Sequence, residues 1–272
     1  MICNCNNWHE ISSGGLTAGA SATITVEQVE GGVICGGSAV VDMPQYVYDG
    51  MAGVWPLNET GNGTIDEYKD RSQFKIHGTG GEGLASRTPS SDNGVFCLSA
   101  ANFNSSSSQY ISFPADSIKT TGTFTVSAWI KLENKYFPRM IFSRGCFSIG
   151  YSFLNHLVAN LKTENNDAVI STDCYSLETM QPDKFYHVAA TYNGSSLSVY
   201  INGNLSNSVS ISGSTAEPTM GYHGRWASGG YHYGLLQEVR LHSMARNSAW
   251  LQAEHSNFCN GNFYSIGDEE IL

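Results

Sequence analysis

The sequence predicts an all-β fold of antiparallel strands, and three runs in its second half carry the prediction. Phe124–Leu132, Phe185–Gly194 and Leu197–Gly203 each alternate apolar and polar residues. A period of two places one side of a strand on a core and the other in water. The last two runs end in Asn-Gly, which supplies the positive φ angles that a tight hairpin requires. The chain is therefore expected to consist of short strands joined by turns.

The composition of the chain is that of a globular protein with a weakly charged surface. The chain has 272 residues, of which 41% are hydrophobic and 11% aromatic, so it can bury a large core. Charged residues make up only 14%, which leaves Ser, Thr, Asn and Gly to form the surface. A net charge of −10 offers no basic patch for a phosphate backbone, so no nucleic-acid partner is expected. No apolar run is long enough to span a bilayer, so membrane insertion is not expected.

Residues 1–45 are expected to form an N-terminal attachment arm. Ala22–Val29 alternates like a strand, and a glycine-rich stretch follows at Gly31–Gly37. A single strand cannot bury a core of its own, so the arm should dock on the rest of the protein or on another subunit. A flexible leader is the alternative.

Residues 46–258 are predicted to form one β-sandwich. Besides the three runs above, the expected strands are Gly53–Gly61 with its turn, Gly94–Leu98, Gln109–Phe113, Met140–Ser143, Phe147–Gly150, His156–Leu161 and Gly234–His242. In the strand at 124–132, alternation favours Val126, Ala128 and Ile130 as the core side. Further inward candidates are Trp55, Phe124, Trp129, Tyr186, Val188, Ala190, Leu197, Val199, Ile201, Val239 and Leu241.

One segment, Ser243–Asn257, is predicted to be helical, and residues 259–272 are expected to form a C-terminal tail. Ser243 or Asn247 can cap the helix. Its apolar residues at helical spacing are Ala249, Trp250 and Ala253.

The motifs as a set resemble the laminin G-like, concanavalin A-like lectin (pentraxin-related) family. Thr-Val-Ser-Ala-Trp-Ile-Lys at 125–131, Tyr-His-Val-Ala-Ala-Thr-Tyr at 186–192, Tyr-Ile-Asn-Gly at 200–203 and the strand at 234–242 match its strands in order. The resemblance covers about residues 46–245. It implies a two-sheet antiparallel jelly-roll sandwich of the laminin G type, in a family that mostly recognises ligands and whose histidine at the position of His187 is structural.

The C-terminal region resembles bacterial and phage members of this family. Ala-Arg-Asn-Ser-Ala-Trp at 245–250 and Phe-Tyr-Ser-Ile-Gly at 263–267 carry this likeness. It implies a prokaryotic or phage source.

The sequence predicts that the protein is not an enzyme. Glycoside hydrolysis needs two carboxylates that face one cleft, but Asp66 and Glu67 are adjacent and point to opposite sides, and the acids at 268–270 lie in the tail. The glucanase branch of the family carries Glu-x-Asp-x-x-Glu on a strand, and this chain has no such pattern. It also has no Gly-x-Ser-x-Gly elbow for a serine nucleophile.

The loop at Gly221–Gly234 is the candidate ligand-binding site. Sugars stack their CH faces on aromatic rings while polar side chains bind their hydroxyl groups. The resemblance gives the alternative, since this stretch leads into the final strand of the family and some of its aromatic rings pack inward. The candidate residues are Tyr222, His223, Arg225, Trp226, Tyr231, His232 and Tyr233.

The resemblance also implies a structural calcium, because many such sandwiches bind it through a loop aspartate. Asp70 matches that aspartate. The closing strand reads Gln237–Glu238 where the family has Asp-Glu, so one frequent oxygen ligand is replaced by a neutral amide.

Seven cysteines leave at least one without an intramolecular partner. Cys3 and Cys5 are too close for a relaxed mutual disulfide, so one should pair with Cys35 or another chain. Disulfides and buried thiols remain alternatives for all seven. The disulfide candidates are Cys3, Cys5, Cys35, Cys97, Cys146, Cys174 and Cys259.

Residues 1–10 lack the basic and apolar regions of a secretory signal. An extracellular type of module without one is expected to be a mature fragment, an intracellular protein, or a virion component released by lysis, and Met1 counts against the first. The leading prediction is a virion-surface protein of a phage (capsid decoration, head-fibre or tail-associated), oligomeric or part of a larger assembly, attached through its arm to other virion proteins. The alternative is a bacterial extracellular carbohydrate-binding or adhesion module. Glycans are the expected ligands.

Overall fold

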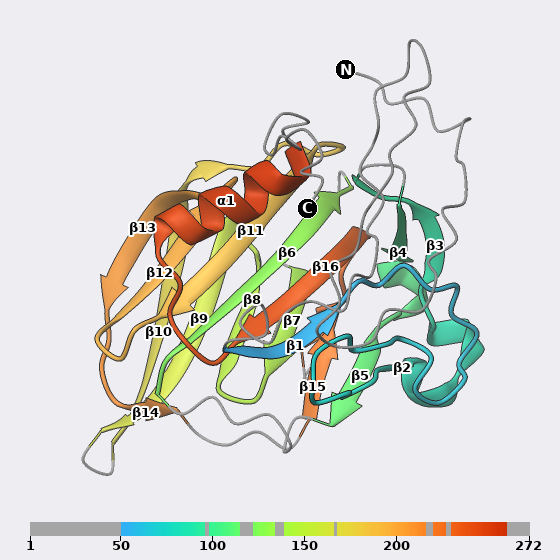
Figure 1. The fold of residues 1–272 in the computed structure, drawn as a ribbon, viewed down its shortest axis with the longest axis horizontal. Helices are drawn as coiled ribbons and strands as arrows, with labels where there is room; N and C mark the ends of the chain where they lie inside the picture. Colours follow the sequence, from blue (N-terminus) through green and yellow to red (C-terminus); the bar gives the residue numbers. More distant parts are fainter. Residues whose placement is uncertain are drawn as a thin grey trace, which may run out of the picture.

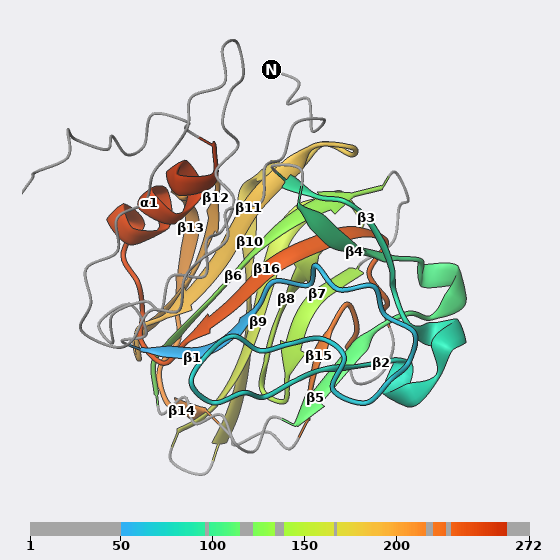
Figure 2. The same cartoon turned by 45° about the vertical axis from the view of Figure 1, so that its right-hand side comes forward.

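A computed structural model describes residues 50–95, 98–114, 122–133, 139–165, 168–215, 220–226 and 230–259. They form two antiparallel eight-stranded sheets packed face to face, with one helix outside them (Figures 1 and 2). The predicted all-β sandwich is therefore confirmed. The arm at 1–45 and the tail after Cys259 lie outside the described residues.

The first sheet has the strand order β13-β12-β11-β6-β16-β4-β3, and β1 pairs with β16. β16 therefore has three neighbours: β6 along one edge, and β4 and β1 along successive halves of the other. The strands of this sheet are β1 (Met51–Trp55), β3 (Ser90–Asn93), β4 (Ser99–Phe103), β6 (Phe124–Leu132), β11 (Phe185–Tyr192), β12 (Ser196–Ile201), β13 (Asn204–Ser210) and β16 (Gly234–His242).

The second sheet has the strand order β10-β9-β8-β7-β15-β5-β2, and β14 pairs with β9. Its members are β2 (Thr79–Gly80), β5 (Ile111–Pro114), β7 (Arg139–Arg144), β8 (Phe147–Tyr151), β9 (His156–Asn165), β10 (Ala168–Thr179), β14 (Ser214–Thr215) and β15 (Met220–His223). Among them, β15 lies between β7 and β5, so it brings the loop after His223 close to residues more than a hundred positions earlier.

The core lies between the two sheets, and strand alternation decides which side chains enter it. Val126, Ala128 and Ile130 belong to the core cluster, as predicted. Trp129 was also an inward candidate, and this is wrong. Its ring is on the other side of the first sheet, where it stacks on His255 of the helix at 5.5 Å, because consecutive residues of a strand face opposite ways.

The strand predicted at Gly94–Leu98 is also wrong. Gly94 N donates to the Leu98 carbonyl at 2.7 Å, and Leu98 N donates to the Val95 carbonyl at 3.3 Å, so the segment turns between β3 and β4. Val95 N also donates to Gln237 Oε1 at 2.8 Å, which fastens this turn to β16. A short apolar run does not distinguish a strand from a buried turn.

The helix α1 (Ser248–Cys259) lies across the outer side of the first sheet (Figure 1). Asn247 caps it, since its Oδ1 accepts the Trp250 N–H at 2.9 Å. The predicted apolar face is wrong, because Trp250 is 39% exposed and Leu251 is fully buried. Leu251 packs on Ala189 and Tyr200 of the sheet. Of the described helices, none has the length and apolar character needed to cross a membrane.

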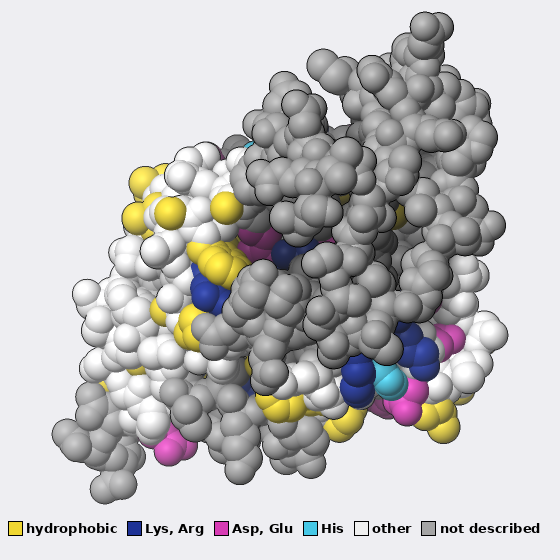
Figure 3. Space-filling model, in the orientation of Figure 1, with side chains coloured by type: hydrophobic (Ala, Val, Ile, Leu, Met, Phe, Trp, Pro, Cys, Tyr) yellow, Lys and Arg dark blue, Asp and Glu magenta, His cyan; other side chains and the backbone are white. Residues whose placement is uncertain are grey.

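Figure 3 shows the side of the molecule that carries α1. In its described part, hydrophobic side chains are scattered rather than gathered into one patch. Basic, acidic and histidine side chains gather over the loop between β1 and β2.

Candidate recognition site

The structure divides the predicted loop between the core and the surface. On β15, Gly221 and His223 face the core, and Tyr222 faces outward with partial exposure. Gly224 then turns the chain with a φ of 76°, and a Cβ atom there would collide with the ring of Phe103. Only glycine fits this turn. After it, Arg225 lies at the surface, partly exposed.

His223 and His232 are core residues and cannot contact a ligand from the described surface. His223 packs against the rings of Trp55, Phe113 and Phe142, and it has no exposed area. Burial lowers the pKa of His223 to about 3 and that of His232 to about 4. Both imidazoles are therefore neutral near pH 7.

Tyr222, Arg225 and Tyr231 of the loop join Tyr110, a buried residue just before β5, in a tyrosine–arginine cluster. The Arg225 Cζ lies 4.5 Å from the ring centroid of Tyr110, 4.9 Å from that of Tyr222 and 5.9 Å from that of Tyr231. A guanidinium at such distances is attracted by the faces of the rings. The cluster therefore combines rigid aromatic surface with one positive charge.

Backbone hydrogen bonds hold this cluster on β7. The Ser143 hydroxyl donates to the Arg225 carbonyl at 2.7 Å, and Gly224 N donates to the Ile141 carbonyl at 2.8 Å. Farther along the loop, Met140 N donates to the Gly230 carbonyl at 3.1 Å. The side chains are thus carried by a strand edge, and such support favours a pre-formed site.

Glu82 joins the cluster, although sequence reasoning did not select it. Its carboxylate lies 3.7 Å from Arg225 Nη1. Burial, and then the negative charge of Glu82, raise the pKa of Tyr110. The sequence signal was Gly80-Gly-Glu-Gly83, because glycines around one acid allow the left-handed turn that presents it.

Trp226 and Tyr233 adjoin the cluster in sequence, since Trp226 follows Arg225 and Tyr233 lies two residues after Tyr231. Trp226 is 38% exposed, so its indole is open to a ligand. Tyr233 is partly buried with its ring 6.0 Å from the Arg139 guanidinium, and Arg139 also donates to the Tyr231 carbonyl at 3.1 Å. Such an arrangement can stack a sugar ring and bind its oxygens, since aromatic faces and arginine donors are adjacent.

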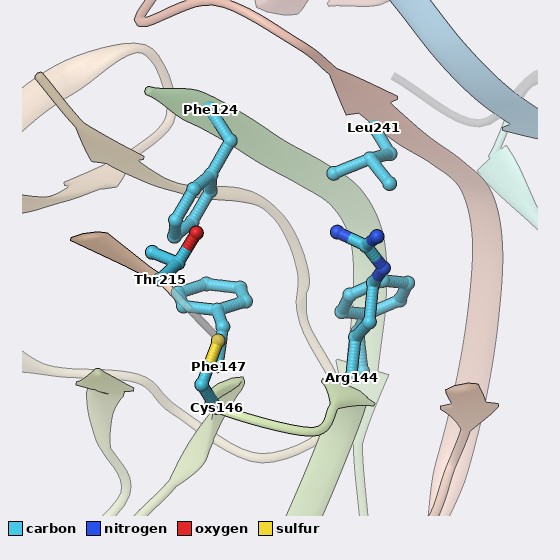
Figure 4. Close-up of a pocket in the computed structure, with 7 residues that line it drawn as sticks. Phe124, Arg144, Cys146, Phe147, Thr215 and Leu241 are labelled. Carbon is cyan, nitrogen blue, oxygen red and sulfur yellow. The ribbon is translucent and has the colours of Figure 1, made fainter. Parts of the chain in front are cut away.

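A small pocket opens between the sheets at another place. The space in it that is open to a water molecule is about 10 Å³, room for about one water and far below the range of about 300–1,000 Å³ that is usual for ligand sites. Figure 4 shows Phe124 and Leu241 of the first sheet facing Arg144, Cys146 and Phe147 of the second. We therefore place the candidate site at the tyrosine–arginine cluster.

Asp70 does not fit the implied calcium ion. Its Oδ1 accepts the N–H groups of Val54 and Ser72 at 2.8 Å each, and its Oδ2 accepts the Ser72 hydroxyl at 2.7 Å and Ile76 N at 2.9 Å. Two donors on each oxygen fill the carboxylate. In the described part of the chain, no three acidic, histidine or cysteine residues gather as metal ligands. Asp70 therefore organises its own loop.

Two of the seven cysteines can be judged, and both are thiols. Cys174 is fully buried, and burial raises its pKa to about 11, so it is unreactive near pH 7. Cys146 is partly buried beside the small pocket. For both, the predicted disulfide is wrong, because each packs as a small apolar side chain. Cys3, Cys5, Cys35, Cys97 and the side chain of Cys259 lie outside the described residues.

Of the acids considered for catalysis, Glu67 has a structural role, and those at 268–270 lie outside the described residues. Glu67 accepts backbone N–H groups of Asn62, Gly63, Thr64 and Gly80, which fixes the loop around it. Beneath α1, Ser127, His187 and Glu254 meet, but the Ser127 hydroxyl donates to Glu254 at 2.9 Å rather than to the histidine. All three are buried. This geometry does not activate a nucleophile, which needs a base at its hydroxyl and access to a substrate.

Two of the solved structures that resemble this fold are toxin binding domains. The binding domain of Paraclostridial Mosquitocidal Protein 1 superposes with a TM-score of 0.60 and 16% identity, over 79% of this chain and 53% of that one. A receptor-binding domain of botulinum neurotoxin mosaic serotype C/D gives 0.56 and 15%, over 78% and 51%. The chain thus spans about half the length of these toxin domains.

A third similar structure is matched over nearly all of its own length. Domain 4 of AbnA, a GH43 extracellular arabinanase from Geobacillus stearothermophilus, was solved with arabinotriose and gives a TM-score of 0.53 at 17% identity, over 74% of this chain and 96% of that one. No curated protein sequence matches the chain. The model of the concanavalin A-like lectin/glucanases superfamily, however, matches residues 104–252, more than half of the sequence. The chain therefore belongs to the concanavalin A-like lectin/glucanase superfamily.

Proposed function

We propose that this protein is a non-enzymatic, lectin-like recognition protein that binds a glycan at the tyrosine–arginine cluster and Trp226. The observation that carries this proposal is the exposed indole of Trp226, adjacent in sequence to an arginine stacked among three tyrosines. Exposed tryptophan and tyrosine beside arginine are the residues that most often anchor a bound partner. The arabinotriose complex of the similar arabinanase domain supports a sugar ligand.

The proposal includes display at a surface, and the preferred setting is a phage virion. The similar structures come from toxin binding domains and an extracellular enzyme, which supports exposure outside a cell. The resemblance of the C-terminal region to phage proteins supports the virion. The alternative, a bacterial extracellular carbohydrate-binding or adhesion module, is favoured by the arabinanase domain. Mass spectrometry of purified particles separates the two, since detection only in cell-envelope fractions would eliminate the virion.

Binding is tested on a glycan array with two matched tryptophan variants. Trp226→Ala should weaken binding about tenfold or more, the equivalent of a stacking contact. Trp250→Ala is the control, because Trp250 is 39% exposed and also lies against an arginine, with Arg246 Cζ at 3.8 Å, but it is on α1. Equal losses in both variants, or no glycan bound by the wild type, would overturn the proposal.

The attachment arm remains part of the proposal. Deleting residues 1–42 should leave a folded sandwich but abolish assembly, because Ala22–Val29 alternates like a strand that can pair with the edge of a neighbour. Circular dichroism checks the fold, and incorporation into particles checks assembly. Normal incorporation of the shortened chain would mean that attachment runs through the sandwich.

A further inference from the structure

We propose that the glycan is acidic and that its carboxylate takes the place of Glu82 against Arg225. This inference rests on the proposed function and deepens it by naming the ligand class: a glycan with a sialic or uronic acid residue. In the unliganded protein, Glu82 stands in for the ligand carboxylate. Binding is then an exchange of one carboxylate for another.

The contacts of Glu82 are those of a carboxylate-binding site. The Arg225 guanidinium lies 3.7 Å from the Glu82 carboxylate, and the Glu82 charge reaches the Tyr110 hydroxyl, whose pKa it raises. Arginine is the residue best suited to carboxylates, because its planar donors match their two oxygens. The tyrosine rings around Arg225 hold the guanidinium in a fixed place. A ligand carboxylate therefore meets a receptor that is already assembled.

Glu82 itself is held loosely enough to leave. Its side chain is 52% exposed, and exposed ion pairs contribute only about 0–1 kcal/mol. Its backbone has a φ of 54°, between Gly81 at 53° and Gly83 at 90°, and a left-handed conformation is unfavourable for a non-glycine residue. A shift of this loop would move the carboxylate away from Arg225 at little cost.

Local charge favours an anion although the protein is acidic overall. The Arg87 carbonyl accepts the Tyr110 N–H at 3.1 Å, Arg139 donates to the Tyr231 carbonyl, and Arg225 lies against the rings of these two tyrosines. Among the described residues, Glu82 is the acid paired with Arg225. Arginines are thus gathered at this part of the described surface, in a chain with a net charge of −10. Once Glu82 moves aside, the site presents a net positive field to a sugar acid.

The test is calorimetric titration with acids and their own methyl esters. The probes are 3′-sialyllactose and a galacturonic acid trisaccharide, each as the free acid and as the methyl ester, which removes only the charge. The first represents a glycolipid-type headgroup and the second a polysaccharide. The variants are Glu82→Gln, Arg225→Gln and a control, Glu164→Gln. Glu164 is exposed on β9 beside β14, so its substitution changes the net charge equally without touching the cluster.

The wild type should prefer at least one acid over its ester by about tenfold, the value of one charge-assisted contact. Glu82→Gln should tighten acid binding several-fold and leave the ester within twofold, and Arg225→Gln should remove the preference. Equal effects of Glu82→Gln on acid and ester, or an equal gain in Glu164→Gln, would overturn the inference. Binding of neutral glycans that is lost in Trp226→Ala, without any preference for acids, would overturn this inference and leave the proposed function standing.

Discussion

Two of the arginine–glutamate pairs in the described part of the chain lie on the outer sides of different sheets, and they differ in what covers them. Under α1, Arg240 Nη1 lies 3.0 Å from Glu254, whose side chain is 5% exposed. On the second sheet, Arg225 Nη1 lies 3.7 Å from Glu82, whose side chain is 52% exposed. Each site also has an exposed tryptophan nearby in sequence, Trp250 or Trp226. The same residue types therefore serve one closed site and one open site.

The closed pair is out of reach of a ligand, because the Glu254 side chain is almost entirely buried. Glu254 accepts hydrogen bonds from Ser127 and Arg240 and lies 3.7 Å from His187 Nε2. Burial alone would raise the pKa of Glu254, but the charge of Arg240 and the contact with His187 outweigh it and hold that pKa below its ordinary range. Contacts of this kind attach a helix to a sheet. Burial of the glutamate, rather than the types of residue, therefore distinguishes a structural ion pair from one whose carboxylate a ligand can replace.

The largest expected effect comes from breaking the closed pair. Glu254→Gln should lower the free energy of unfolding by about 3 kcal/mol, the low end for breaking a buried ion pair, because Arg240 keeps Glu238 at 3.1 Å as its second counter-charge. Urea unfolding monitored by tryptophan fluorescence measures the change. A loss of unfolding free energy below about 1 kcal/mol would mean that the buried pair stabilises the protein no more than the exposed pair does.

An intermediate effect concerns pH and the two core histidines that lie beneath the open site. Their pKa values of about 3 and 4 are below the unfolded value of 6.5, so the unfolded state binds protons first as the pH falls. Stability is therefore full above about pH 6.5 and declines toward pH 4, by up to about 1.4 kcal/mol per pH unit for each histidine. Urea unfolding at pH 7 and pH 5 measures this slope.

The variant His223→Phe sharpens this prediction. Phenylalanine keeps the contacts with Trp55, Phe113 and Phe142, and it does not titrate. Its stability should fall about 2 kcal/mol less between pH 7 and pH 5 than that of the wild type. A slope equal to that of the wild type would show that His223 is already protonated in the folded state.

The smallest expected effect is that of opening the exposed pair. Glu82→Gln should change the free energy of unfolding by less than about 1 kcal/mol, because solvent screens the pair. The same urea unfolding assay, run beside Glu254→Gln, gives the contrast directly. A loss as large as that of Glu254→Gln would mean that Glu82 is part of the framework and not an exchangeable partner.

The local sequence pattern was sufficient to predict several of the strands but not to predict which residues meet at the site. β6, β11 and β12 follow from alternation and Asn-Gly turns, which act between neighbours in sequence. The face of α1 was assigned wrongly because Glu254 is fixed by Ser127 on a strand 127 residues earlier. Likewise, Tyr110 meets Arg225 only because β5 pairs with β15. Contacts of this range depend on sheet register, which a single sequence does not give.

The three neighbours of β16 have a consequence for the order in which the protein is made. β1 and β4 are synthesised early, yet the strand with which both pair, β16, leaves the ribosome nearly two hundred residues after β1. Until then, β6 also lacks one of its two neighbours. The first sheet can therefore be completed only once β16 has been made, a long-range closure that makes folding slow. Until β16 arrives, the unpaired edges of β1, β4 and β6 are open to aggregation.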